Sequence, residues 1–552
     1  MIADIHITEK SFGDKTLMKD VKFSVDDGEK VGVVGRNGVG KSTLFGILSG
    51  KDTDYTGEVI FRRGITIATT AQEHHGLGDQ TVMSYILGGL PEYSKLKKII
   101  DEYPLTMGDN MRKIEEYTQA LERFDQKGFY QVEEKIEREL SNFQLDGYGN
   151  RKISSLSGGQ KRLVEIVKIM HSEAHLALID EPTNHMDYVA KQQFIDWMNS
   201  QPHQAMLIIT HDRDVLGQVD RIVEIKDGQA VSYRGNYDAY LKQNAQATTA
   251  GMNNFEQIEK RIVNLKQKVL DYQRLKEKSR NPGTIQKFKR LENEARAELE
   301  ELLEMEKPTF WIDKESASQL DYKSAERYGK FKSRNIRLSM KDASSRSQHV
   351  LVRAENVAVG IGERILFEDV NIDLREGEAI EIRGRNGAGK TTLIRMILAS
   401  GKSFDGGPVL YSGDIFLDPQ VRIGVYEQEI DERYLSDPLE KAIEKLYMSR
   451  DLSISDTKIR QLLADYLFMD ADRMTPLARL SGGQKARFQI IVMLANDPQL
   501  LILDEPTNHL DLPSIEELET ALAKYSGAIL YVSHDNYFRE KLGGKVVQIG
   551  AE

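Results

Sequence analysis

The sequence predicts an α/β fold that occurs twice in one chain, with a helical hairpin between the two copies. Residues 31–43 read VGVVGRNGVGKST, and residues 380–392 read IEIRGRNGAGKTT, 349 positions later. The segment LSGGQ occurs at residues 156–160 and again at residues 480–484, 324 positions later. Between the copies, apolar residues recur three and four positions apart. Repeats this far apart are too long for a solenoid and indicate two copies of a domain of about 200 residues or more.

Composition sets wider bounds. The chain has 552 residues, which at about 100–200 residues per domain allows roughly three to five domains. It has no cysteine, which excludes a disulfide scaffold, cysteine-ligated zinc, an iron–sulfur cluster and a cysteine nucleophile. The net charge of −11 argues against a uniformly basic nucleic-acid-binding protein but allows a local basic patch. Apolar stretches are far shorter than the about 20 residues of a membrane span, and no secretory signal is visible, so we expect a cytoplasmic protein.

In each copy an apolar, strand-like segment leads into a glycine-rich loop that is followed by a helical pattern. The first loop reads Gly35-x-x-x-x-Gly40-Lys41-Ser42. Backbone N–H groups of such a loop wrap phosphates at a helix N-terminus, the lysine adds a positive charge, and the hydroxyl suits Mg²⁺. The predicted phosphate-binding residues are Gly35, Asn37, Gly38, Gly40, Lys41, Ser42 and Thr43, and Gly384, Asn386, Gly387, Gly389, Lys390, Thr391 and Thr392.

Two short apolar segments, residues 176–179 and 500–503, predict buried parallel strands, and each ends in an Asp-Glu pair. Ligands of open α/β sheets bind at the carboxyl ends of strands, so these carboxylates would face the phosphate loops. The alternative is that each Asp-Glu pair only caps a helix, but this does not explain why Pro-Thr-Asn-His follows both pairs. Asp180 and Asp504 are predicted to hold Mg²⁺, and Glu181 and Glu505 to polarise the attacking water.

Two histidines and two glutamines occur at matched positions after other strand-like segments. His211 and His534 each begin a His-Asp pair, and although a lone histidine here is more often structural, the matched pair favours a γ-phosphate contact. Gln72 and Gln428 suit the sensing of metal and nucleophilic water, although either glutamine alone would be a weak signal.

The LSGGQ segments add a second anion-binding element to each copy. Ser157 and Gly159, like Ser481 and Gly483, precede a helical pattern and offer free N–H groups, a hydroxyl and a positive dipole end. Each copy already has a phosphate loop, so a second cradle is useful if it caps the nucleotide held by the other copy. The sequence therefore predicts a monomer in which two composite sites form across a head-to-tail pseudo-dimer.

The first copy carries 32 extra residues. This follows from the distance between Gln72 and the first LSGGQ segment, which is longer by that number than the distance between Gln428 and the second. We expect a helical arm at about residues 91–146, since apolar residues at 111–121 and 129–140 have helical spacing. The arm is either an insertion without a binding role or an element that docks on a partner, and the sequence pattern favours neither alternative.

The region between the copies predicts an antiparallel hairpin. Heptad patterns at residues 255–272 and 288–302 are separated by a helix-breaking segment at residues 280–284. The expected division is residues 1–248 for the first domain, 249–347 for the linker with a basic tip near 274–290, and 348–552 for the second domain.

The predicted tip of the hairpin is strongly basic. Residues 260–290 hold eleven basic and two acidic side chains, a net charge of +9. Basic coiled-coil faces are commonly just solvated, but this charge in an acidic protein favours a polyanionic partner. The predicted RNA-binding residues are Lys276, Lys278, Arg280, Lys287, Lys289 and Arg290.

Taken together, these motifs resemble those of the ATP-binding cassette superfamily, with the full ordered set present twice. More narrowly, the chain resembles the ABC-F family, which has twin cassettes without a membrane domain, an arm in the first cassette and a basic helical linker. The resemblance implies two P-loop ATP-binding cassette domains of α/β class, joined by an α-helical antiparallel coiled-coil linker, and a Mg²⁺-dependent ATPase. It also implies a ribosomal partner, with the linker reaching from the tRNA exit site toward the peptidyl-transferase centre to contact rRNA and the peptidyl-site tRNA, and no DNA partner.

One position departs from the family pattern. The family stacks an aromatic side chain on adenine ahead of the phosphate loop, and Phe12 fits this role, but the aligned residue in the second copy is Ile361. The resemblance therefore implies weaker base stacking at the second site, with catalytic residues intact at both.

Two rival classes are disfavoured by the sequence. An ATPase subunit of a membrane importer would have a short linker, and a DNA-repair cassette ATPase usually carries cysteine zinc modules. Within the ABC-F family the role is either general rescue or remodelling of stalled ribosomes, or antibiotic resistance. The short break at residues 280–284 mildly favours the general role.

Overall fold

The computed structural model describes residues 1–13, 15–70, 79–108, 110–184, 186–305, 310–318, 320, 322–332, 335–338, 349–402, 407–427 and 430–550. The chain divides into two compact units, one made of Met1–Tyr237 and Ile336–Glu552 and the other of Asp238–Asn335. The first unit holds both cassettes and the second holds the linker. The linker unit starts before the predicted residue 249 because its first helix runs without a break from Tyr237.

The first cassette contains two sheets. Its antiparallel sheet has the strand order β2-β1-β4, and its mainly parallel sheet has the order β5-β6-β7-β3-β8-β9. Strands β6 and β7 are buried along their whole length, which explains their continuous apolar sequence. The strands are β1 (Ala3–Phe12), β2 (Lys15–Val25), β3 (Lys30–Gly35), β4 (Thr56–Phe61), β5 (Ile67–Thr69), β6 (Leu176–Asp180), β7 (Ala205–Ile209), β8 (Arg221–Lys226) and β9 (Gln229–Arg234).

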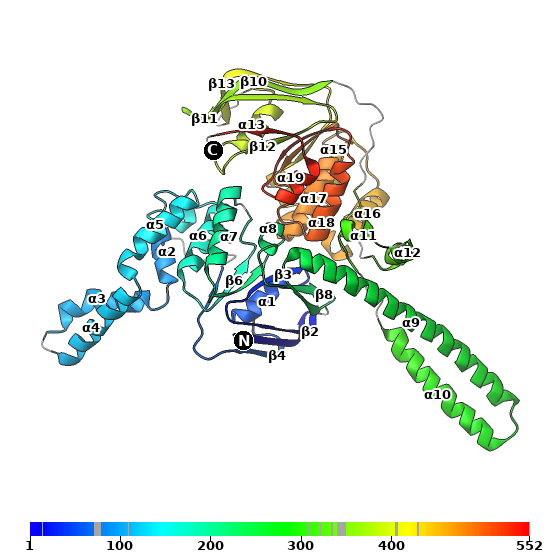
Figure 1. Ribbon diagram of the computed structural model, residues 1–552. Helices are drawn as coiled ribbons and strands as arrows, with labels where there is room; N and C mark the ends of the chain where they lie inside the picture. Colours follow the sequence, from blue (N-terminus) through cyan, green and yellow to red (C-terminus); the bar gives the residue numbers. More distant parts are fainter. Residues whose placement is uncertain are drawn as a thin grey trace. The chain divides into compact units, whose positions relative to one another are not determined.

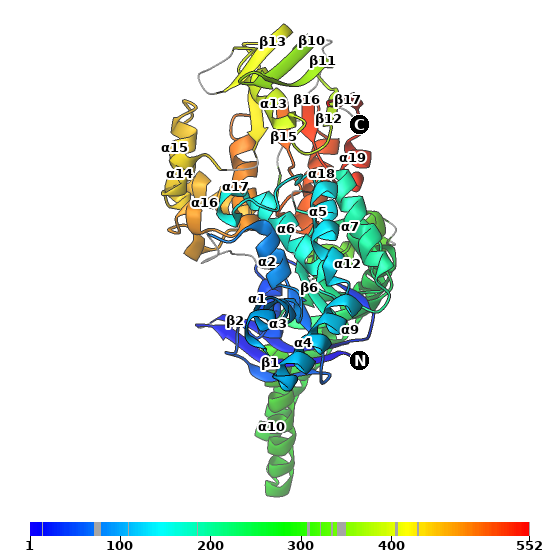
Figure 2. The same ribbon diagram turned by 90° about the vertical axis from the view of Figure 1, so that its left-hand side faces the viewer.

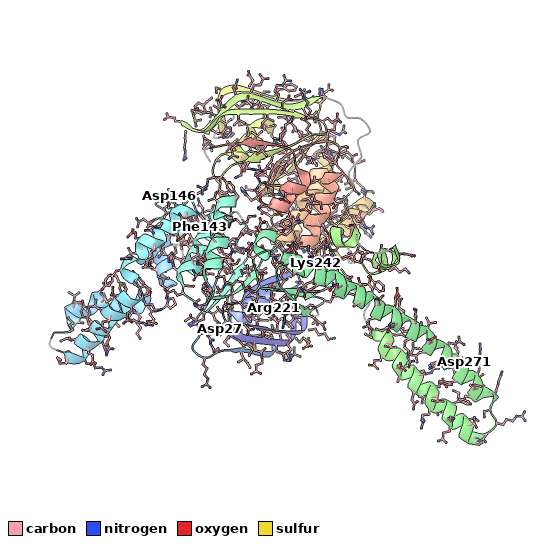
Figure 3. All side chains as sticks on the ribbon, in the orientation of Figure 1. Asp27, Phe143, Asp146, Arg221, Lys242 and Asp271 are labelled. Atoms are coloured by element: carbon pink, nitrogen blue, oxygen red, sulfur yellow. The ribbon has the colours of Figure 1, made fainter. Side chains whose placement is uncertain are left out.

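Helices cover the parallel sheet of the first cassette. Helix α1 follows the glycine-rich loop and α6 follows the first LSGGQ segment, as the sequence predicts. At the start of β8, Arg221 donates two N–H groups to the carboxylate of Glu29, at 2.7 and 2.9 Å. Figure 3 labels Arg221, and also Asp27, which lies two residues before Glu29. The helices are α1 (Lys41–Leu48), α2 (Val82–Gly88), α6 (Gly158–His171), α7 (Tyr188–Ser200) and α8 (Arg213–Leu216).

The second cassette repeats this plan. Its antiparallel sheet has the order β11-β10-β13 (Figure 2), and its parallel sheet has the order β14-β15-β16-β12-β17. The strands are β10 (Val350–Ile361), β11 (Arg364–Arg375), β12 (Ala379–Arg383), β13 (Pro408–Leu417), β14 (Ile423–Tyr426), β15 (Leu500–Asp504), β16 (Ala528–Val532) and β17 (Lys545–Gln548). The helices are α13 (Lys390–Leu398), α14 (Glu432–Leu435), α15 (Leu439–Met448), α16 (Asp456–Asp465), α17 (Gly482–Leu494), α18 (Leu512–Ala523) and α19 (Asn536–Leu542).

The insertion in the first cassette is helical, as predicted. It consists of α3 (Tyr93–Thr106), α4 (Met111–Gln126) and α5 (Val132–Asn142), which Figure 1 shows as an arm. The rings of Tyr93, Phe124 and Phe129 pack on one another with centroids 5.2–5.6 Å apart. These rings belong to the same buried core as α6 and β6, so the arm packs as a continuation of the cassette core. Figure 3 labels Phe143 and Asp146, which lead from α5 back into the cassette.

The linker unit is built on two long antiparallel helices, α9 (Tyr237–Lys278) and α10 (Pro282–Glu304), which lie side by side in Figure 1. Leu265, Val269 and Ala295 are buried between them, which confirms the predicted hairpin. Figure 3 labels Lys242 and Asp271 on α9.

The predicted helix break at residues 280–284 is too long. Helix α10 already begins at Pro282, which occupies a first-turn position where the missing N–H of proline costs nothing. The side chain of Asn281 caps the helix by accepting from the Gly283 N–H at 2.9 Å. Only residues 279–281 separate the two helices.

Two short helices complete the linker unit, α11 (Lys314–Ser318) and α12 (Tyr322–Phe331). Met252, Ile312, Tyr328 and Phe331 form a small buried cluster there. Within the described ranges, no helix is both long enough and apolar enough to cross a membrane.

Candidate functional site

Both glycine-rich loops adopt the conformation that their sequence requires. Gly40 and Gly389 have φ values of 107° and 100°, in the left-handed region that favours glycine. A Cβ on Gly40 would also lie 2.8 Å from the side chain of Leu17. The ammonium of Lys41 donates to the carbonyl of Gly35 at 2.6 Å, and Lys390 donates to Gly384 at 2.9 Å. Burial lowers the pKa of both lysines, so each loop presents a desolvated cation.

A hydroxyl and a carboxylate meet at the carboxyl end of a strand in each cassette. Ser42 Oγ donates to Asp180 Oδ2 at 3.2 Å, and Thr391 Oγ1 donates to Asp504 Oδ2 at 2.7 Å. The other carboxylate oxygen, Asp504 Oδ1, is buried and has no hydrogen-bond partner in the described part of the chain. These hard oxygen donors fit Mg²⁺, which when bound with ATP would offset the charge of the phosphates.

The Asp-Glu and His-Asp pairs come together in each cassette. Glu181 Oε1 lies 3.7 Å from His211 Nε2, and Glu505 Oε1 lies 3.3 Å from His534 Nε2. Burial, reinforced by the neighbouring aspartate, raises the pKa of Glu181 to about 8 and that of Glu505 to about 7. Carboxyl groups with pKa values near neutrality suit the abstraction of a proton from water.

The two histidines are buried and neutral. Burial lowers the pKa of His211 and of His534 to about 3 in each case. Both ring nitrogens of His211, and Nε2 of His534, lack a hydrogen-bond partner among the described residues. A neutral ring with an unused N–H is suited to donate to a phosphate oxygen.

The second site opens into a cavity of about 900 Å³ that both cassettes line and that also reaches Glu181 and His211 of the first site. Ser157 and Gly159 of the first cassette face the phosphate loop and His534 of the second. Across this boundary, the N–H of Asn386 donates to Asp187 Oδ2 at 3.0 Å. Each serine caps its signature helix, and Gln160 N donates to Ser157 Oγ at 3.3 Å.

The first site is closed in the same head-to-tail way. The N–H of Asn37 donates to Asp511 Oδ2 at 3.2 Å, and its side-chain amide donates to the His509 carbonyl at 2.8 Å. Gly483 packs so closely that a Cβ there would lie 2.1 Å from Asn37 Nδ2. Each phosphate loop therefore faces the signature segment of the opposite cassette.

The remaining predicted residues fall into two groups. Gln72 and Gln428 lie outside the described residues. Phe12 ends β1 with 57% of its surface exposed, and the Lys10 ammonium lies 4.7 Å from its ring centroid. Ile361 ends the equivalent strand β10, is 54% exposed, and lines the cavity of the second site.

Sequence reasoning assigned no role to three residues at the cassette boundary. Asp187 and Asp511 end the repeated PTNH-Met/Leu-Asp segments, so their repetition could have revealed them. Lys191 also lines the cavity at the second site. Its counterpart in the second copy is Ile515, so repetition could not have revealed it.

Comparisons with known proteins agree with this architecture. The sequence profile of the family described as "ABC transporter" matches residues 18–184 and 367–508. The "Putative ATP-binding protein YdiF" of Bacillus subtilis (strain 168) is 30% identical, covering 100% of this chain and 80% of that protein. The "ABC transporter F family member 2" of Arabidopsis thaliana is 28% identical, covering 98% and 75%. The "Ribosome protection protein VmlR" of Bacillus subtilis (strain 168) is 27% identical, covering 96% and 83%.

The paired α/β cassettes with facing phosphate loops and signature segments define an ATP-binding cassette ATPase. The chain belongs to the ATP-binding cassette family and, within it, to the ABC-F family.

Proposed function

We propose that this chain binds the ribosome near the tRNA exit site and couples ATP binding and hydrolysis to the remodelling or rescue of stalled ribosomes. In this proposal two ATP molecules, each with Mg²⁺, close the cassettes, and the linker tip contacts rRNA and the peptidyl-site tRNA. The observation that carries the proposal is the basic linker tip, and the name of the relative VmlR supports it.

The charges at the tip divide into paired and unpaired groups. Lys276 binds the buried Glu292 at 2.5 Å and, with Gln273 and Arg296, holds the pKa of Glu292 low, at about 2. Arg290 pairs with Glu294 at 3.3 Å. Lys276 therefore serves the hairpin itself. Four of the predicted contact residues are exposed and make no side-chain hydrogen bond or ion pair with the described residues: Lys278, Arg280, Lys287 and Lys289.

Reversing the unpaired charges should weaken ribosome binding. We expect the triple variant Lys278→Glu, Arg280→Glu, Lys287→Glu to bind at least about 10-fold more weakly and to show a smaller salt dependence, because each lost phosphate contact removes about 0.7–0.9 from the log–log salt slope. Co-sedimentation with ribosomes at several salt concentrations measures both effects.

The matched control carries the same charge change on α9 farther from the turn between the two helices, at three exposed residues: Lys260, Lys266 and Lys268. Basal ATP binding should be unchanged in both variants. An equal loss of ribosome binding in the control would show that the tip has no special role.

We infer that the two sites hold the base of ATP differently. The exposed Ile361 cannot stack on a base as Phe12 can, and an aromatic–base stack is worth about 1–3 kcal/mol. We therefore expect Ile361→Phe to tighten ATP binding at the second site about fivefold or more. Titration of a fluorescent ATP analogue, with the first site weakened by Lys41→Ala, measures this affinity. The reciprocal change Phe12→Ile should weaken the first site, and equal affinities in all variants would contradict the inference.

A further inference from the structure

A buried ammonium from the first cassette contacts the His534 loop of the second. Lys191 lies on α7 and is only 4% exposed. Its Nζ donates to the carbonyl of His534 at 2.8 Å and to Asp214 Oδ2 at 2.5 Å, and lies 3.4 Å from Asp212 Oδ2. The two aspartates come from the first cassette, so they hold the ammonium in place while its third contact reaches across to the second.

The backbone of His534 connects this ammonium to the proposed catalytic carboxylate. The His534 N–H donates to Glu505 Oε2 at 3.2 Å, while its carbonyl accepts from Lys191 at 2.8 Å. The two backbone groups on either side of the His534 α-carbon are therefore both fixed. This fixes the direction in which the imidazole leaves the backbone and keeps an N–H donor on Glu505.

The rest of the boundary anchors the same loop. Arg213 of the first cassette donates to Asp535 Oδ2 at 3.0 Å and also binds the buried Glu519 on α18. The amide of Asn536 donates back to Asp214 at 2.9 Å. Residues 534–536 are thus held by three side chains of the first cassette.

In the part of the chain that the structure describes, only the second site has this arrangement. The residue that matches Lys191 in the second copy is Ile515, which is 3% exposed and has no donor to offer to the His211 carbonyl. Glu519 is likewise matched by the buried Ile195. The first site has the same Glu–His pair, but among the described residues no cation of the second cassette binds its histidine loop, and Lys191 contacts that loop through Asp212 and Asp214 from the same cassette.

We propose that Lys191 is a positioning residue for the second ATP site, where it holds the His534 loop in its hydrolytic geometry once the cassettes close. The His534 loop of the second site then depends on a cation from the opposite cassette, whereas the His211 loop of the first site does not. The proposal rests on the assignment of Glu505 and His534 to ATP hydrolysis and is independent of ribosome binding.

The test separates the two sites in the full-length chain. Glu181→Gln leaves the second site with its carboxylate, and Glu505→Gln leaves the first. In the Glu181→Gln background, we expect Lys191→Met to lower kcat for ATP by at least about 10-fold, since a small misplacement of a reacting group can cost about 100-fold. KM should change by less than about threefold, because ATP binding is retained. In the Glu505→Gln background, kcat should fall by a clearly smaller factor, less than about threefold, because Lys191 contacts the His211 loop only through the carboxylates of Asp212 and Asp214.

Two further variants distinguish positioning from general support of the interface. Lys191→Arg keeps the charge and its reach and should restore much of the lost kcat, whereas the control Gln192→Met, on the exposed side of the same helix, should change neither site. Equal losses at both sites, or an unchanged second site in Lys191→Met, would overturn the proposal.

A second measurement does not depend on turnover. In the ATP-loaded Glu181→Gln, Glu505→Gln protein, Lys191→Met should speed amide hydrogen exchange in peptides covering residues 530–537 and leave the first phosphate loop, residues 35–42, unchanged. Unchanged exchange at residues 530–537, or equal acceleration in both segments, would refute the positioning role. Absence of hydrolysis in the unmodified chain would instead refute the assigned ATPase sites, and the exchange result would still test Lys191.

Discussion

ATP hydrolysis is expected to fall by about 100-fold or more when Glu181 and Glu505 are both replaced by glutamine, because general-base catalysis contributes about 10²–10⁴-fold. The amide keeps the shape of the carboxyl group but cannot take a proton from water. ATP binding should persist, since the phosphate loops are untouched. With ATP bound and not hydrolysed, the cassettes should stay closed and the protein should remain on ribosomes.

Phosphate release, ATP binding and ribosome co-sedimentation together measure these effects. The matched control replaces two exposed glutamates, Glu122 and Glu432, by glutamine and should behave like the unmodified chain. Loss of hydrolysis without retention on ribosomes would support the assigned carboxylates and contradict the proposed partner. Full hydrolysis in the double variant would contradict the assignment of the carboxylates.

Gly483→Val is expected to hinder closure over the first site. Even a Cβ at this position would lie 2.1 Å from Asn37 Nδ2 and 2.7 Å from Asn37 Cγ, so either the Asn37 side chain turns away and loses its hydrogen bond to the His509 carbonyl, or the signature segment and the phosphate loop separate. Overpacking of this kind costs about 1–3 kcal/mol, which corresponds to a loss of about 5- to 150-fold in the closed state. In the Glu505→Gln background, kcat should fall by this factor while ATP still binds the open cassette.

Phosphate release and binding of a fluorescent ATP analogue separate these two quantities. Gly88→Ala serves as a control, because a Cβ there meets nothing within 4 Å. A first site that hydrolyses ATP normally in Gly483→Val would show that the observed approach of Gly483 to Asn37 is not needed for turnover.

The local features of the sites could be predicted from the sequence because each depends on a short segment and occurs twice. The loop before Lys41 needs glycine at Gly40, and the strand before Asp180 must be apolar because it is buried. Both requirements are visible in neighbouring residues. The head-to-tail arrangement followed from counting anion-binding segments, since two per copy exceed what one nucleotide needs.

Contacts that arise only from packing could not be predicted in this way. Lys276 appeared to be one of several tip cations, yet the register of the two linker helices places it on Glu292. Lys191 was assigned no role from the sequence, yet it is buried where the second cassette packs on its helix. Neither partner lies near in the sequence, and neither pair is repeated.

Joining two cassettes in one chain removes a constraint that symmetry imposes on homodimers. In a two-fold dimer every residue serves both copies of the interface, so a lysine at position 191 would appear at both sites or at neither. Here the position that matches Lys191 in the second copy holds Ile515, and the position that matches Phe12 holds Ile361. The two copies therefore differ at positions that affect one nucleotide site each. A single substitution in this chain alters one nucleotide site and leaves an unaltered reference site in the same molecule.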